Sequence, residues 1–194
     1  MSHSSQTHKI ISLRFSIVTM RNCVFRYICW LAFCVVSSTQ VVMATGIQAE
    51  VLGVYFTPDP RAAMAIVQAV DASEHEVLVQ AYGFTHNGIA QALVRAHRRG
   101  VAVRVVMDAK TANTNQYVIG LLQQDDIATR QDDKHAIAHD KVMVIDNAIV
   151  ITGSFNFTNS AATRNAENVL VLTSTELAQR YKTDWLKHWA HSRD

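Results

Sequence analysis

Five polar side chains in the last third of the chain have types and spacings suited to phosphoryl chemistry. His139 and Lys141 stand two apart, Ser154 and Asn156 stand two apart, and Glu167 follows in Asn-Ala-Glu-Asn. Residues two apart on a strand point the same way, so each pair should project from one face and the two pairs could meet. An imidazole, an ammonium, a hydroxyl and a carboxamide would then offer a nucleophile or proton shuttle, a charge for an anion, and donors for phosphoryl oxygens.

A metal site is the alternative use of one of these histidines. His135 and His139 are four apart, which on a helix would make a metal-binding pair. The residues around them are typical of strand or loop, and after position 44 the chain has no HExxH motif and no cysteine site. The sequence therefore predicts no metal and no cofactor.

The remaining polar clusters have simpler interpretations. We expect His75, His86 and His97 to be solvated, and the aspartates at 132 and 133 to be solvated loop charges or, as the alternative, to edge the active-site groove. The histidines at 188 and 191 fall in the last helix, where a cation is favourable near the C-terminus. Arginines 95, 98 and 99 crowd the end of another helix, as a solvated face that complements the helix dipole or as contacts to nucleic-acid phosphates.

The elements that must position the site alternate between strands and helices. Strands are expected over 50–56, 77–84, 101–107 and 127–130, and over two runs between 141 and 151 joined by a turn at 146–148. Helices are expected over 60–70, from 87 to a stop at Gly100, over 114–124, and after the capping box at 173–176. This order predicts an α/β domain with a mixed β-sheet sandwiched between helix layers.

The N-terminal stretch has the order of a secretory signal peptide. From Met20 it presents two arginines, an apolar run over Tyr27–Val36 and a small residue, Ala44, at the expected cut. The apolar run has about ten residues, whereas a membrane span needs roughly 20. We expect residues 1–44 to be a cleaved export signal, with Met20 as an alternative start, and a periplasmic or secreted protein without a stable membrane anchor.

Composition bounds the mature domain, residues 45–194. The three cysteines stand at 23, 29 and 34, so thiol catalysis and disulfides are excluded after cleavage. The four basic residues before position 45 have no acidic counterpart, and removing them from the 18 leaves 14 basic against 16 acidic residues, a charge near −2. This balance does not favour a polyanion binder, so affinity for DNA would have to come from a local groove.

The residues His139-Asp140-Lys141 to Asp146, then Gly-Ser-Phe-Asn at 153–156 and Glu167, resemble the HKD motif of the phospholipase D superfamily with its trailing GSxN and Glu elements. Length, signal peptide and element order are similar to the small, exported, single-motif endonucleases of that superfamily that work in EDTA. The resemblance implies the phospholipase D/nuclease fold and a metal-independent phosphodiesterase.

The resemblance also implies a role for each motif residue. His139 would attack phosphorus to form a phosphohistidine, while Lys141 and Asn156 would hold the non-bridging oxygens with Ser154 beside them. Glu167 would accept a hydrogen bond from the other ring nitrogen of His139 and set its tautomer.

Two further motif positions would be structural. Asp146 is expected to be a hydrogen-bonding residue at the hairpin turn, and Gly153 belongs to the same structural framework.

One motif per chain implies a homodimer. Displacing an alkoxide needs a nucleophile on one side and an acid on the other, and in this superfamily both are motif histidines. A two-fold interface would bring His139 of each subunit to one shared site.

Three functions follow. The first is a non-specific endonuclease acting on DNA and also RNA. The second is a phospholipase D-type hydrolase of phosphatidyl lipids, although no basic amphipathic surface helix is predicted for bilayer docking. The third is a catalytically silent binding or scaffold dimer, against which the intact His139, Lys141 and Glu167 argue.

Overall fold

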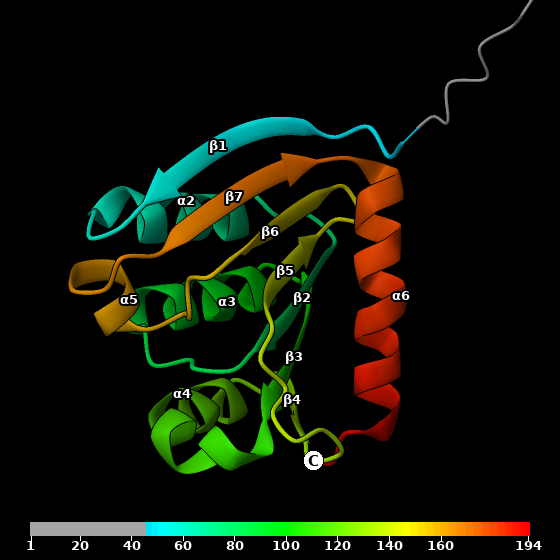
Figure 1. Ribbon diagram of the computed structural model, residues 1–194. Coiled ribbons are helices and arrows are strands. Elements are labelled where there is room, and N and C mark those ends of the chain that lie inside the picture. Colours follow the sequence, from blue (N-terminus) through cyan, green and yellow to red (C-terminus); the bar gives the residue numbers. More distant parts are fainter. Residues whose placement is uncertain (1–45) are drawn as a thin grey trace, which may run out of the picture. The chain divides into compact units, whose positions relative to one another are not determined.

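The computed structural model describes residues 46–194, which form one compact unit (Figure 1). The expected signal peptide at 1–44 and the alternative start at Met20 lie outside the described residues. No helix within 46–194 has the length and apolar character needed to cross a membrane.

A seven-stranded mixed sheet runs through the domain in the order β1-β7-β6-β5-β2-β3-β4. Its strands are β1 (Glu50–Phe56), β2 (Glu76–Ala81), β3 (Ala102–Asp108), β4 (Ala128–Asp132), β5 (Lys141–Ile145), β6 (Ile149–Gly153) and β7 (Asn168–Thr173). β2, β3 and β4 are parallel, whereas β5, β6, β7 and β1 pair antiparallel with their neighbours. Consequently β1, β2, β3, β4 and β6 end at the same side of the sheet where β5 and β7 begin. We call this side the site edge.

Helices cover both faces of the sheet (Figure 1). They are α2 (Pro60–Asp71), α3 (Asn87–Arg98), the 3-10 turn η1 (Ala109–Thr111), α4 (Ala112–Gln124), α5 (Asn159–Thr163) and α6 (Thr175–His191). The larger core lies under α2, α3 and α4, and a smaller core around Trp185 lies under α6. The predicted α/β fold with a mixed sheet between helix layers is confirmed.

Local signals in the sequence explain where these elements begin and end. Asp59 caps α2 by accepting from the Arg61 N–H, and Pro60 takes the first helical position. Gly100 ends α3 with a φ of 94°, a conformation that glycine adopts without a Cβ penalty. Asp146 and Asn147, both with φ of 51°, form the tight turn between β5 and β6.

Two parts of the fold differ from the expectation. The stretch 168–173 forms β7, which inserts between β1 and β6; no strand was expected here, although its Val-Leu-Val-Leu run is typical of one. The cap of α6 is Ser174, whose hydroxyl accepts from the Leu177 N–H, and not the expected Thr173. The side chain at 174 is the one that reaches the free N–H groups of the first turn.

Candidate active site

The site edge brings the expected catalytic residues together from three neighbouring strands, β5, β6 and β7. His139 and Lys141 stand at the start of β5, Ser154 and Asn156 follow β6, and Glu167 precedes β7. Strand direction explains this convergence, because β5 and β7 start at the edge where β6 ends.

Tyr82, directly after β2, lies beside both His139 and Lys141. The rings of Tyr82 and His139 meet edge to face with centroids 4.6 Å apart, and the Lys141 ammonium lies 5.4 Å from the Tyr82 ring centroid. His139 is exposed, whereas Lys141 is only 8% exposed and its Nζ donates to the His139 carbonyl oxygen at 2.6 Å. An accessible imidazole thus stands beside a desolvated cation.

The buried position of Lys141 alters its electrostatics. Burial lowers the pKa of the Lys141 ammonium below its usual value, and the charges of Asp140 and Glu167 oppose this shift. A cation in a partly desolvated setting attracts an anion more strongly than one in bulk water. Lys141 is therefore well placed to bind a phosphate oxygen next to His139.

Glu167 takes a different partner from the one expected. Its Oε2 accepts from the Ser154 hydroxyl at 2.6 Å and its Oε1 accepts from the Asn165 side chain at 3.0 Å. The expected hydrogen bond from His139 to Glu167 is not formed within the described residues, and the Ser154 hydroxyl is the group that donates to this carboxylate. The backbone of Glu167 is held by Thr57, which pairs with it in both directions at 3.0 Å.

Asn156 joins the site through the segment that follows β2. Its Oδ1 accepts from the Gly83 N–H at 3.4 Å, next to Tyr82. This contact leaves the amide group of the Asn156 side chain as a donor for an incoming oxygen.

Gly153 lets β6 and β7 approach each other at the site. Its φ is 149°, and a Cβ at this position would lie 2.2 Å from the Asn168 carbonyl oxygen. The following residue, Ser154, accepts from the Asn168 N–H at 3.0 Å. The small residue thus sets the separation of the strands that carry Ser154 and Glu167.

Asp146 lies at the opposite side of the sheet from His139. Its carboxylate accepts from the backbone N–H groups of Glu74, His75 and Glu76 at 2.8 to 2.9 Å. Burial raises the pKa of Asp146, but these three hydrogen bonds outweigh burial and leave the pKa below its usual value. Its contacts are those of a turn residue that fixes the entry to β2.

Two buried residues that the sequence did not single out hold the catalytic segments. Asp108 accepts from the Ala138 N–H at 2.7 Å, directly before His139, and is 1% exposed. Asn115 in α4 is fully buried, accepts from the Phe84 N–H at 2.8 Å and donates to the Tyr82 carbonyl at 3.0 Å. Polar residues at the end of an apolar strand and inside an apolar helix stripe were the available signals.

The interpretation of several charged residues changes with the structure. Asp132 is 1% exposed and contacts His135, His188 and His191, so it is not a solvated loop charge. His86 caps α3 by accepting from the Ile89 N–H, and its partial burial lowers its pKa.

The arginines at the end of α3 pair within the domain. Arg95 pairs with Asp71 and Arg98 with Asp125, both at 2.7 Å. Arg99 donates to the Val70 carbonyl at 3.1 Å. These contacts agree with the interpretation of the arginines as a solvated helix face.

Comparison with known proteins assigns this arrangement to a class. A family model described as a cardiolipin synthase, PLD-like domain matches residues 66–189, which include the whole candidate site. The chain belongs to the phospholipase D superfamily, a family of phosphodiesterases, and the resemblance drawn from the sequence is confirmed.

Two relatives of known name and one solved structure show which members of the superfamily this chain is similar to. A Rickettsia prowazekii protein named phospholipase D is 42% identical over 130 residues, which are 67% of this chain and 63% of that protein. A mouse mitochondrial cardiolipin hydrolase is 31% identical over 124 residues, 64% of this chain and 56% of that protein. The solved structure of Nuc from Salmonella typhimurium, described as a phospholipase D family member, is 35% identical with a TM-score of 0.72; the match covers 76% of this chain and 98% of Nuc.

Proposed function

We propose that this protein is a metal-independent endonuclease that hydrolyses DNA, and RNA as a further substrate, through a phosphohistidine on His139. The observation that carries the proposal is the exposed His139 imidazole next to the buried Lys141 ammonium at the site edge. The match over 98% of Nuc, which is described as a phospholipase D family member, supports the phosphodiesterase part of the proposal.

The chemistry needs one bond to form as another breaks. A ring nitrogen of His139 attacks phosphorus, the N–P bond forms, and the bond to the leaving alkoxide breaks while Lys141 and Asn156 hold the non-bridging oxygens. The alkoxide takes a proton from a second acid. That acid, now a base, then removes a proton from water, which attacks phosphorus and releases His139.

The second acid would be His139 of a partner subunit in a homodimer. Exposed apolar side chains at the end of β1 support such an interface: Leu52, Val54 and Phe56 are 50%, 49% and 69% exposed. Phe56 pairs in register with Asn168, next to Glu167, so this apolar strip reaches the candidate site. A contiguous exposed apolar strip is typical of a protein contact surface.

Replacing Phe56 with Asp should therefore give a monomer that loses cleavage. The matched control is Leu186→Asp, which changes a residue of α6 with 42% exposure outside the strip. Light scattering and a cleavage assay on both variants test this. A monomeric wild-type protein with full activity would remove the dimer from the proposal.

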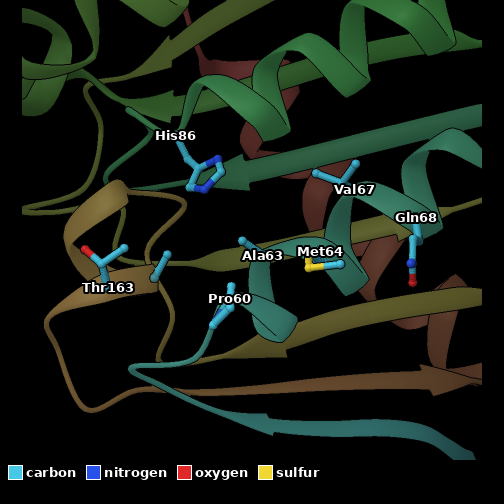
Figure 2. Close-up of a pocket in the computed structure, with 8 residues that line it drawn as sticks. Pro60, Ala63, Met64, Val67, Gln68, His86 and Thr163 are labelled. Atoms are coloured by element: carbon cyan, nitrogen blue, oxygen red, sulfur yellow. The ribbon is translucent and has the colours of Figure 1, made fainter.

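A lipid phosphodiester is the second candidate substrate. The relatives named phospholipase D and cardiolipin hydrolase favour it. An apolar pocket of about 360 Å³ also lies between α2 and α5, lined by Ala63, Met64 and Val67 and bordered by His86 (Figure 2). α5, which borders this pocket, begins three positions after Asn156 of the candidate site, so the pocket is a candidate position for an acyl chain.

The protein purified after export should nick plasmid DNA at the same initial rate with and without EDTA at 25 °C. His139→Ala should abolish nicking, whereas the matched control His75→Ala, an exposed histidine outside the site, should retain it. Vesicles of phosphatidylcholine and cardiolipin are assayed in parallel. Intact DNA together with headgroup release would favour the lipid as substrate. No cleavage in either assay would reject both candidate substrates.

We also propose that residues 1–44 are an export signal cleaved after Ala44, which would place the enzyme in the periplasm or outside the cell. N-terminal sequencing of the exported protein, with Thr45 as the expected first residue, tests this.

A further inference from the structure

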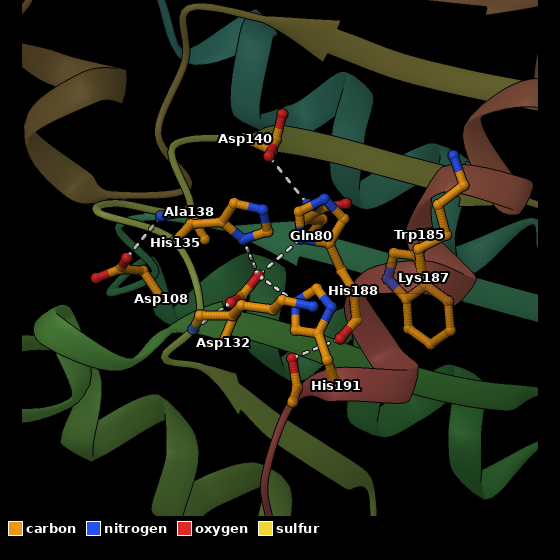
Figure 3. Close-up of polar contacts among 12 residues, drawn as sticks. Gln80, Asp108, Asp132, His135, Ala138, Asp140, Trp185, Lys187, His188 and His191 are labelled. Carbon is orange, nitrogen blue, oxygen red and sulfur yellow. Dashed lines mark hydrogen bonds and ion pairs between the residues drawn. The ribbon is translucent and has the colours of Figure 1, made fainter.

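Three histidines surround a buried carboxylate at the far end of the sheet from β1. Asp132 ends β4, His135 follows in the loop to β5, and His188 and His191 stand three apart near the end of α6. Because residues three apart share one helix face, both α6 imidazoles reach the Asp132 carboxylate (Figure 3). One ligand atom from each of the four residues lies within 4.8 Å of the other three.

The distances fit a tetrahedral cation site. The nitrogens His135 Nδ1, His188 Nδ1 and His191 Nε2 lie 3.0, 2.7 and 3.1 Å from Asp132 Oδ2. Zinc bonds of about 2.0–2.1 Å in a tetrahedron would place ligand atoms about 3.3 Å apart. All four ligand atoms lie within 4.8 Å of one another, and His135, whose side chain is 46% exposed and stands on a loop, has room to move toward tetrahedral separations.

Hydrogen bonding alone does not satisfy this cluster. Three ring nitrogens approach one carboxylate oxygen, and the buried His191 Nε2 lacks a hydrogen-bond partner despite its 3.1 Å distance from Asp132 Oδ2. A buried imidazole nitrogen without a partner is costly. A cation bound by the nitrogen lone pairs would remove that cost.

Neighbouring groups orient the would-be ligands. The other Asp132 oxygen, Oδ1, accepts from the Lys134 N–H at 3.0 Å, which leaves Oδ2 directed at the histidines. His188 Nε2 lies 3.6 Å from the Asp184 carboxylate while its Nδ1 faces Asp132. A carboxylate behind a ligating histidine is a recurrent arrangement that fixes the histidine tautomer at metal sites.

We propose that Asp132, His135, His188 and His191 form a structural site for a divalent transition-metal ion, zinc above all. Three imidazoles and one carboxylate are borderline ligands suited to zinc. Four protein ligands leave no open position for a substrate, so the ion would have a structural role. It joins the end of α6 to the loop that leads, four residues after His135, to His139.

The site adds a component to the proposed enzyme without entering its chemistry. In the sequence, His135 is four positions from His139 but 53 and 56 positions from His188 and His191, so local spacing does not reveal this site. Zinc bound here would stabilise the domain and restrain the His139 loop, while phosphoryl transfer would still rest on His139 and Lys141.

Metal analysis of the untagged full chain, loaded with Zn²⁺ and desalted, tests the site directly. We expect about one zinc per chain, and a loss of at least tenfold in His188→Ala/His191→Ala. His75→Ala, which removes an exposed histidine elsewhere, should keep the metal. Should the double variant fold poorly, the loop variant His135→Ala serves in its place, and it should retain less zinc than wild type.

Two further readouts separate a built site from surface binding. Co²⁺ in place of zinc should give the visible absorption of a tetrahedral complex in wild type but not in the double variant. Zinc at about a hundredfold above its Kd should raise Tm by roughly 5–10 °C over the chelated protein. Wild type without stoichiometric metal, or a double variant that retains it, would overturn the proposal, and neither result bears on the nuclease assay.

Discussion

Replacing Gly153 with alanine should disrupt the candidate site through the backbone alone. The added Cβ would stand 2.2 Å from the Asn168 carbonyl oxygen and 3.0 Å from the Asn168 carbonyl carbon. Because both are backbone atoms, no side-chain rotation can relieve the clash. β6 and β7 would have to separate by about 1 Å, roughly the shortfall from an ordinary van der Waals contact.

The energetic cost has two parts. A φ of 149° is open to glycine and costs another residue about 1–3 kcal/mol, and overpacking adds about 1–3 kcal/mol. Relaxation of the strand ends limits the sum, so we expect a loss of about 2–4 kcal/mol. For a domain of this size that corresponds to a fall in Tm of roughly 5–15 °C.

The same separation should impair activity. It would break the hydrogen bonds between Ser154 and Asn168, which are 3.0 and 3.2 Å long, and move Glu167 with β7. We expect cleavage of phosphodiester substrate to fall more than tenfold at a temperature where the variant is still folded.

Gly120→Ala is the matched control. Gly120 lies inside α4, and a Cβ there would meet nothing within 4 Å. Alanine should gain about 0.5–1 kcal/mol in helix propensity and raise Tm by roughly 1–4 °C. Thermal unfolding by circular dichroism measures both variants. A Gly153→Ala protein with wild-type Tm and wild-type rate would refute the close-approach argument.

Other perturbations have equally definite outcomes. Asp146→Ala should cost about 1.5–3 kcal/mol at pH 7, since it removes a carboxylate that accepts three backbone N–H groups. Because the folded pKa of Asp146 is lowered, its stabilisation is present above pH 4 and lost as the pH falls through the folded pKa, so urea titrations of the two proteins should converge in acid. Lys141→Met should lower cleavage about a hundredfold or more, because it removes the cation that binds the phosphate. It should nevertheless raise Tm at pH 7, because burial disfavours the Lys141 ammonium, and this gain in Tm should shrink as the pH rises toward 10. A variant with a lower Tm than wild type at pH 7 would contradict the desolvation argument. Trp185→Ala should lower the free energy of unfolding by about 3–5 kcal/mol, because it empties the core under α6 and removes the 2.9 Å indole hydrogen bond to the Val79 carbonyl. Denaturation midpoints measure this change. A decrease below about 1 kcal/mol would show that this side chain does not hold α6.

Local signals in the sequence were sufficient for most of the secondary structure. Asp59-Pro60 set the start of α2, Gly100 the end of α3, and the apolar run after it predicted the buried strand β3. Each of these depends on backbone conformations or side chains within a few residues, so neighbouring sequence suffices. The spacing of His139, Lys141, Ser154 and Asn156 likewise indicated the candidate site.

Tertiary structure decided what depends on strand order. β7 is fixed by its pairing with β1 and β6, and Tyr82 reaches His139 only because β2 and β5 are neighbours. The hydrogen-bond partner of Glu167 is also set by strand order, since Ser154 follows β6, the strand next to β7.

The histidines around Asp132 show most clearly the difference between what the sequence predicts and what the tertiary structure decides. Near Asp132 the sequence offers one histidine with short spacing, and His188 and His191 come into range only because α6 crosses the sheet and ends at the site edge. Types and local spacing of residues are written in the chain, and contacts across more than fifty positions exist only after the sheet has assembled. The sequence therefore determined which chemistry was available, and the fold decided which side chains share it.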